Sequence, residues 1–238
     1  MENKMVKKEQ VLPDYIKNES IGVENISTQD VLTPRLKLIQ ASSIERRELN
    51  IPEGHFLNSI SKEDYGNKVT FIPILTTSGY LIFEGEGIDA KVIARKFKGD
   101  IIPPLNEEMI TKEKISWHID AKGNNVKPEA ILTYVYIGLV NERDLVSWSL
   151  SSSAIKVAKQ FNSLLLLKNC PIYAQTFQIT SKLTKGSGGE FYIPQISPAG
   201  FVEKELYLKL EEQYNKLKTK RFVYEEQMNE VETKDENF

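Results

Sequence analysis

Tyrosine side chains that alternate along one predicted strand are the first residues of this sequence that could do chemistry. Residues 130–140 are a long run of β-forming residues, and the odd-numbered positions from 131 to 139 are mostly apolar. Because side chains alternate across a strand, Tyr134 and Tyr136 would stand side by side on the opposite face. Two neighbouring tyrosines can stack with unpaired bases, as single-strand binding requires. The same pair could instead pack against the second predicted helix, residues 201–222, or against a dimer partner, and the sequence leaves these interpretations open.

A glycine-rich connection supplies a second group of candidate residues. The segment 185–189 reads Lys-Gly-Ser-Gly-Gly and begins at Lys185, with Lys182 just before it and Tyr192 just after it. Glycine lets backbone N–H groups approach a phosphate, the lysines add positive charge, and the tyrosine adds a ring for stacking. A flexible hairpin loop with incidental lysines explains the same pattern equally well.

Three more residues complete the predicted nucleic-acid surface. Lys156 and Lys159 fall outside the apolar stripe of a predicted helix, and Trp117 lies in a polar and basic segment. Exposed cations and rings are the groups that hold the phosphates and bases of single strands. The predicted DNA-binding residues are therefore Trp117, Tyr134, Tyr136, Lys156, Lys159, Lys182, Lys185 and Tyr192.

The sequence lacks the residue patterns typical of catalysis and of metal binding. It has neither a phosphate-binding Gly-x-x-x-x-Gly-Lys-Ser/Thr loop nor a Gly-x-Ser-x-Gly nucleophile elbow. His55, His118 and Cys170 are widely separated, which gives no support for a zinc site. Glu84 and Glu86 could hold a cation, but acids beside glycine more often form a solvated turn. We therefore expect a non-enzymatic protein without a metal or other cofactor.

Charge is divided unevenly along the chain. The net charge is −2, of which −5 falls on residues 223–238 and +3 on residues 1–222. The acidic segment includes Asp235 and Glu236 and ends in Phe238, whose ring and carboxylate could fill a pocket on a protein partner. The same segment could compete with DNA for a basic groove, or it could simply keep the protein in solution.

Composition indicates a globular protein of the cytoplasm. Of the 238 residues, 40% are hydrophobic and 27% are charged, which suits one large domain or two small ones. The longest apolar run, residues 164–167, is far shorter than the ~20 residues of a membrane span. We expect no secretory signal, because the first residues lack an apolar segment, and the single Cys170 suits a reducing compartment.

Short strands and two helices are predicted to position the candidate residues. Residues 98–129 are expected to form a long loop with a short ordered piece around Trp117. Strands are predicted at 69–75, 80–83, 90–95, 130–140, 145–150, 172–181 and 190–196, and helices at 153–168 and 201–222.

A helix just before the final hairpin predicts a particular fold class. It is a mainly β, α+β fold: an OB-like five-stranded barrel with insertions, although short strands also build sandwiches. The predicted organisation is a flexible arm at 1–27, an OB-like single-stranded DNA-binding domain at 28–200, a helix at 201–222 and an acidic disordered tail at 223–238.

The acidic tail with its terminal Phe238 resembles the tails of phage-type single-stranded DNA-binding proteins. Residues 33–38, 54–59 and 156–159 are also similar to stretches of phage proteins from replication regions. In that family an OB-fold domain coats single strands and the tail recruits polymerase, helicase or primase. The resemblance therefore implies single-stranded DNA as the ligand of the body. It also implies replication proteins as the partners of Asp235, Glu236 and Phe238.

Two functions follow from these observations. The first is a non-catalytic single-stranded DNA-binding protein of phage DNA replication or recombination, located in the host cytoplasm. The alternative is a phage structural or protein-interaction module, in which the β body assembles and the tail is a peptide ligand. Either protein could form a homo-oligomer.

Overall fold

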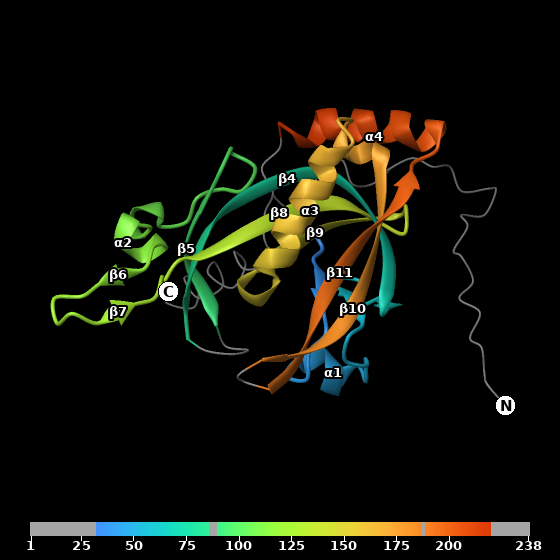
Figure 1. The fold of residues 1–238 in the computed structure, drawn as a ribbon. Coiled ribbons are helices and arrows are strands. Elements are labelled where there is room, and N and C mark those ends of the chain that lie inside the picture. Colours follow the sequence, from blue (N-terminus) through green and yellow to red (C-terminus); the bar gives the residue numbers. More distant parts are fainter. Residues whose placement is uncertain (1–31, 86–89, 187–188, 220–238) are drawn as a thin grey trace, which may run out of the picture. The chain divides into compact units, whose positions relative to one another are not determined.

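The computed structural model describes residues 32–85, 90–186 and 189–219 of the chain (Figure 1). The predicted arm at 1–27 and the acidic tail at 223–238, with Asp235, Glu236 and Phe238, lie outside these ranges. Among the helices that the structure describes, none combines the length and the hydropathy needed to cross a membrane.

An antiparallel sheet of six strands is the centre of the described unit. Its strands follow the order β11-β10-β4-β8-β9, and β5 pairs with β4. The bounds are β4 Lys68–Glu84, β5 Lys91–Phe97, β8 Ile131–Val140, β9 Asp144–Ser151, β10 Gln175–Gly186 and β11 Gly189–Phe201.

The long strand β4 organises this sheet. It pairs with β10 through its first residues, with β8 through its middle and with β5 through its last residues. Its register against β8 shifts between Pro73 and Leu75. Proline has no backbone N–H to donate to a ladder, so a proline in a central strand is tolerated at such a bulge.

A small three-stranded sheet lies against both edges of the large one. It consists of β1 Leu36–Leu38, β2 Phe56–Asn58 and β3 Asp64–Gly66. Just before β1, Arg35 forms a parallel bridge with Ser147 of β9, and just after β1 the Gln40 side chain bonds to the backbone of Tyr192 in β11. The β1 segment therefore runs from one edge of the large sheet to the other.

Helices cover the two faces of the sheet. Helix α3, Ile155–Leu167, crosses β8 and β9 in Figure 1, and helix α4, Lys204–Leu217, packs against Ile72, Ile74 and Leu139 of the sheet. The core beneath α3 is aromatic, with Phe161 of the helix 4.7 Å from the Tyr136 ring and 4.8 Å from the Phe177 ring. Both faces of β8 are therefore buried.

The remaining elements are short. In Figure 1, β6 and β7 extend away from the β10–β11 hairpin. The bounds are α1 Ile44–Glu48, α2 Lys112–Ile115, β6 His118–Ile119, β7 Asn125–Val126, η2 Glu107–Met109, η3 Ser152–Ala154 and η4 Ile172–Ala174.

The structure confirms the predicted α+β class and the helix before the last hairpin. The described strands do not close into a barrel, because β11 and β9 are the two ends of the strand order and share no ladder. The expected loop at 98–129 contains η2, α2, β6 and β7. The last helix begins at Lys204 rather than at Phe201, because Phe201 pairs with Gln175 in the sheet.

Candidate functional site

A groove of about 870 Å³ lies along the β1 segment, between the edges of the large sheet. Its walls come from β1 and α1, from the ends of β4 and β5, from β9 and from β11. We call this hollow the main groove. Its volume lies in the range of about 300–1,000 Å³ that is usual for ligand sites.

Basic side chains outnumber acidic ones in the main groove. Arg35, Lys37, Lys62 and Arg95 line it, together with the acids Glu45 and Glu48. The Lys37 ammonium donates to Glu45 at 2.7 Å, a pair that neutralises one charge of each sign. Burial alone would raise the pKa of Glu45, but this hydrogen bond from Lys37 holds the pKa below its usual value. The charged side chains that line the groove are thus four basic and two acidic ones.

Arg95 places a fixed charge in the wall of the groove. Its side chain belongs to β5 and is only 2% exposed, and its Nε donates to the carbonyl of Pro103 at 2.9 Å. A guanidinium stays protonated in proteins even when it is buried. The low polarity around it makes its attraction for an anion stronger than the same charge would exert in water.

Apolar and aromatic side chains line the rest of the groove. Phe83 and Phe97 lie on its β4 and β5 side, while Ile44 and Leu49 lie on its α1 side. Phe83, Ile44 and Leu49 are each at least 38% exposed, although large apolar side chains are normally covered. The lining therefore combines apolar and aromatic surface with basic side chains.

Tyr192 is held at the edge of the main groove by two local features. The Gln40 amide donates to the Tyr192 carbonyl at 2.9 Å and accepts from its N–H at 2.8 Å, so it replaces a missing neighbour strand. Gly54 lies against the ring, and a Cβ built at that position would come within 2.6 Å of Tyr192 Cε1. Tyr192, one of the residues that the sequence predicts to bind DNA, therefore lies in the wall of the main groove.

The predicted tyrosine platform is corrected by the structure. Tyr136 is completely buried, and its hydroxyl lies 2.7 Å from Asn162 Oδ1 and 3.1 Å from the Ala158 carbonyl of α3. Burial raises the pKa of this phenol. Tyr134 is partly buried against the same core cluster. The Tyr136 ring is covered, and the Tyr134 ring partly covered, because α3 crosses the face that the alternation of β8 assigns to them. The covering helix is the first predicted helix rather than the second.

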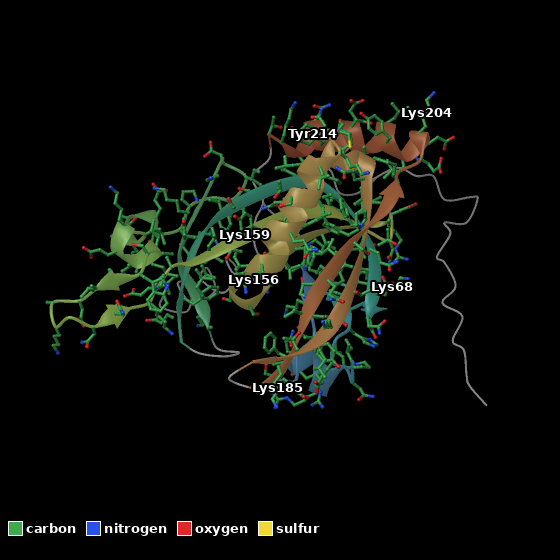
Figure 2. The ribbon with its side chains drawn as sticks, in the orientation of Figure 1. Lys68, Lys156, Lys159, Lys185, Lys204 and Tyr214 are labelled. Atoms are coloured by element: carbon green, nitrogen blue, oxygen red, sulfur yellow. The ribbon has the colours of Figure 1, made fainter. Side chains whose placement is uncertain are left out.

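The predicted lysines do not gather at one place. Lys156 and Lys159 are exposed on α3, and Lys185 lies near the turn of the β10–β11 hairpin, well apart from them in Figure 2. Lys185 shares a sheet face with Tyr192, because Tyr192 pairs with Leu183, two residues before Lys185. Lys182 lies on the opposite face of the strand.

Trp117 is separated from the main groove lining but remains a surface residue. It immediately precedes β6, and its side chain is 69% exposed; that of Ile119, two residues later, is 70% exposed. Alternation along the strand puts both side chains on one face of the β6–β7 ribbon.

The residues that sequence reasoning missed come from segments that look unremarkable individually. Arg35 and Lys37 belong to a stretch in which basic and apolar residues alternate, which we interpret from sequence as a half-exposed edge strand. Lys62 directly follows a turn, and Arg95 lies in a strand of mixed residues. Only the pairing of distant strands brings these four cations to one groove, so no local sequence pattern predicts that they lie together.

Comparison with protein-family models gives a match that covers most of the chain. Residues 6–222 match the model described as Pam3 phage gp34-like protein. Comparison with curated proteins and with solved structures gave no match. Among the residues that the structure describes, no cluster of three or more His, Cys, Asp or Glu side chains could hold a metal ion.

Proposed function

The chain belongs to the Pam3 phage gp34-like family, and we propose that it is a non-catalytic phage protein that binds single-stranded DNA in the main groove. The observation that carries the proposal is the lining of this groove, where cations and aromatic rings occur together. Phosphates of a strand would contact the exposed Lys62 and the partly exposed Arg35 and Lys37, and its bases would contact the rings and the apolar wall.

The apolar lining favours single strands over a duplex. A DNA duplex presents its phosphates outward and keeps its bases stacked inside. Its phosphates could therefore contact the cations of the groove, but its bases could not contact the aromatic rings. Phe83 and Tyr192 can contact a base only where that base is unpaired. The ligand that uses both parts of the groove is therefore a single strand.

The position of the β1 segment supports an OB-like interpretation of the fold. OB folds are partly open five-stranded barrels that bind oligonucleotides on one face. Here the β1 segment bridges the gap between β9 and β11 through one backbone bridge and one side-chain clamp. The main groove lies along this partly open side.

The acidic tail completes the proposed function. Residues 223–238 carry a net charge of −5 and end in Phe238. We propose that Asp235, Glu236 and Phe238 recruit a replication or recombination protein while the groove holds DNA. A short acidic peptide with an aromatic ring suits a pocket with a basic rim.

Titration with a fluorescent oligo-dT of about 20 nucleotides, at about 50 mM and about 200 mM salt, tests the DNA proposal. Lys62→Gln removes one groove cation and should weaken binding at both salt concentrations. Lys204→Gln is the matched control, because Lys204 is an exposed lysine of α4 outside the groove lining (Figure 2). Equal affinity for both variants and the wild type would reject the groove as the DNA site.

The β6–β7 ribbon favours the second candidate function, an assembly or interaction module. The Trp117 and Ile119 side chains are 69% and 70% exposed. Exposed apolar pairs of this kind often mark protein contacts. If assembly is the main function, Trp117→Ser with Ile119→Ser should abolish self-association in sedimentation velocity, and the wild type should not bind dT.

A further inference from the structure

We propose that a second hollow beside Tyr192 binds the continuation of the same DNA strand, so that the Tyr192 ring separates two successive subsites. The hollow has a volume of about 660 Å³ and is lined by Arg46, Arg47, Asn50 and Tyr192, with Ile51–Glu53 completing its wall. We call it the arginine hollow. This inference rests on the proposed function of the main groove and extends it to the path of the strand.

Tyr192 connects the two hollows directly, because it is part of the lining of both. A strand that leaves the main groove past this residue therefore enters the arginine hollow. A ring between two sites for successive nucleotides can stack with a base of either one. The volume of the arginine hollow lies within the range of about 300–1,000 Å³ of small-ligand sites, which is enough for at least one nucleotide.

The ring is held in this position by residues of the β1 segment and its neighbouring turn. Gln40 binds both backbone polar groups of Tyr192, and Gly54 leaves room for the ring. Gly54 has a φ of +79°, a conformation that glycine adopts without strain. Gln40 and Gly54 are therefore positioning residues for the boundary between the subsites.

The charges of the hollow indicate phosphate as the group it binds. Arg46 is partly neutralised, since its Nε lies 2.8 Å from Glu53 Oε1. Arg47 is exposed and makes no ion pair within the part of the chain that the structure describes. A guanidinium can bind a phosphate through two parallel hydrogen bonds and can also stack on a base. Arg47 is therefore the residue that we expect to contact the backbone of the strand.

Oligonucleotide length separates the two subsites. We would titrate the full chain with dT oligonucleotides of about 4 and about 20 nucleotides, and compare the wild type with Lys62→Gln in the main groove and Arg47→Gln in the arginine hollow. Lys62→Gln should weaken binding of both lengths. Arg47→Gln should leave the short oligonucleotide unaffected and weaken the long one by about tenfold.

The salt dependence distinguishes a lost phosphate contact from a damaged fold. For the long oligonucleotide, Arg47→Gln should make the slope of log K against log salt shallower by about 0.7 to 1, with no change for the short one. The inference is overturned if the wild type binds both oligonucleotides and Arg47→Gln changes the affinity for neither of them, or weakens both affinities equally. If the wild type binds neither the short nor the long oligonucleotide, the proposed function is rejected, and this inference with it.

Discussion

Loss of the Tyr136 hydroxyl should lower stability and leave DNA binding unchanged. In the structure this buried group has two acceptors on α3, Asn162 Oδ1 at 2.7 Å and the Ala158 carbonyl at 3.1 Å. Tyr136→Phe keeps the ring contact with Phe161, at 4.7 Å, and removes only the donor. The change therefore isolates the hydrogen bond that ties β8 to α3.

The magnitude follows from the cost of losing one buried hydrogen bond. Such a bond contributes about 0.5–1.5 kcal/mol, and leaving a buried partner unsatisfied costs about 1–3 kcal/mol. Asn162 is partly exposed and can turn to water, so we expect a loss of about 1–2 kcal/mol in the free energy of unfolding. For a domain of about 150–250 residues this corresponds to a decrease in Tm of about 2–8 °C.

Tyr134→Phe is the matched control, since the Tyr134 hydroxyl makes no hydrogen bond within the described residues that would be lost. Thermal unfolding followed by circular dichroism should show almost no change in its Tm, within about 0.5 kcal/mol. Both variants should bind oligo-dT like the wild type at a temperature where they are folded. An unchanged Tm for Tyr136→Phe together with weakened DNA binding would refute the burial argument. It would instead support the prediction that Tyr134 and Tyr136 stack with DNA bases.

Three other measurements test different parts of the molecule. Burial alone would raise the pKa of Asp144, but hydrogen bonds from Arg143 and Tyr65 hold this pKa below its usual value. The carboxylate therefore stabilises the fold above a pH of about 4 and loses that effect as the pH falls through its lowered pKa. In urea unfolding at a series of pH values, Asp144→Asn should lose less stability in acid than the wild type, and an identical pH profile would contradict this. If three to six groove and hollow cations contact phosphate, log K for oligo-dT should fall against log salt with a slope of about −2 to −4, whereas a flat plot would remove these cations from the interface. Deleting residues 223–238, which carry −5, should strengthen DNA binding modestly at low salt, because a tethered anionic segment competes for the basic groove; weaker binding after the deletion would make the tail part of the DNA site.

The elements with strong local patterns could be predicted from the sequence. The β8–β9 hairpin and helix α3 were evident because alternating residues and an apolar stripe are local signals. The alternation of residues in β8 does not show whether the face with the tyrosines is exposed or covered, because tyrosine is common on both kinds of face. The position of α3 over Tyr136 depends on packing between segments about 20 residues apart, which periodicity does not report.

The candidate site was harder to predict than the fold. The sequence predicts Tyr192 as a candidate because an aromatic residue next to a basic glycine-rich loop is a local signal. Arg95 was missed because a single arginine in a strand gives no indication that its side chain will be buried beside a groove. Arg46 and Arg47 form a visible basic pair in the sequence, but only the clamp between Gln40 and Tyr192 brings them next to the ring.

The most direct test of the central claim is the affinity of the full chain for oligo-dT with and without the Tyr192 ring. Tyr192→Ala keeps the backbone groups that Gln40 holds and removes the ring of the residue that lines both hollows. Loss of one base stack should cost about 1–3 kcal/mol, which is about a 5- to 150-fold increase in Kd, measured by fluorescence anisotropy at low salt. Tyr192→Phe should bind nearly like the wild type, because it retains the ring. Equal affinity of the wild type and Tyr192→Ala, with both proteins folded, would contradict the account.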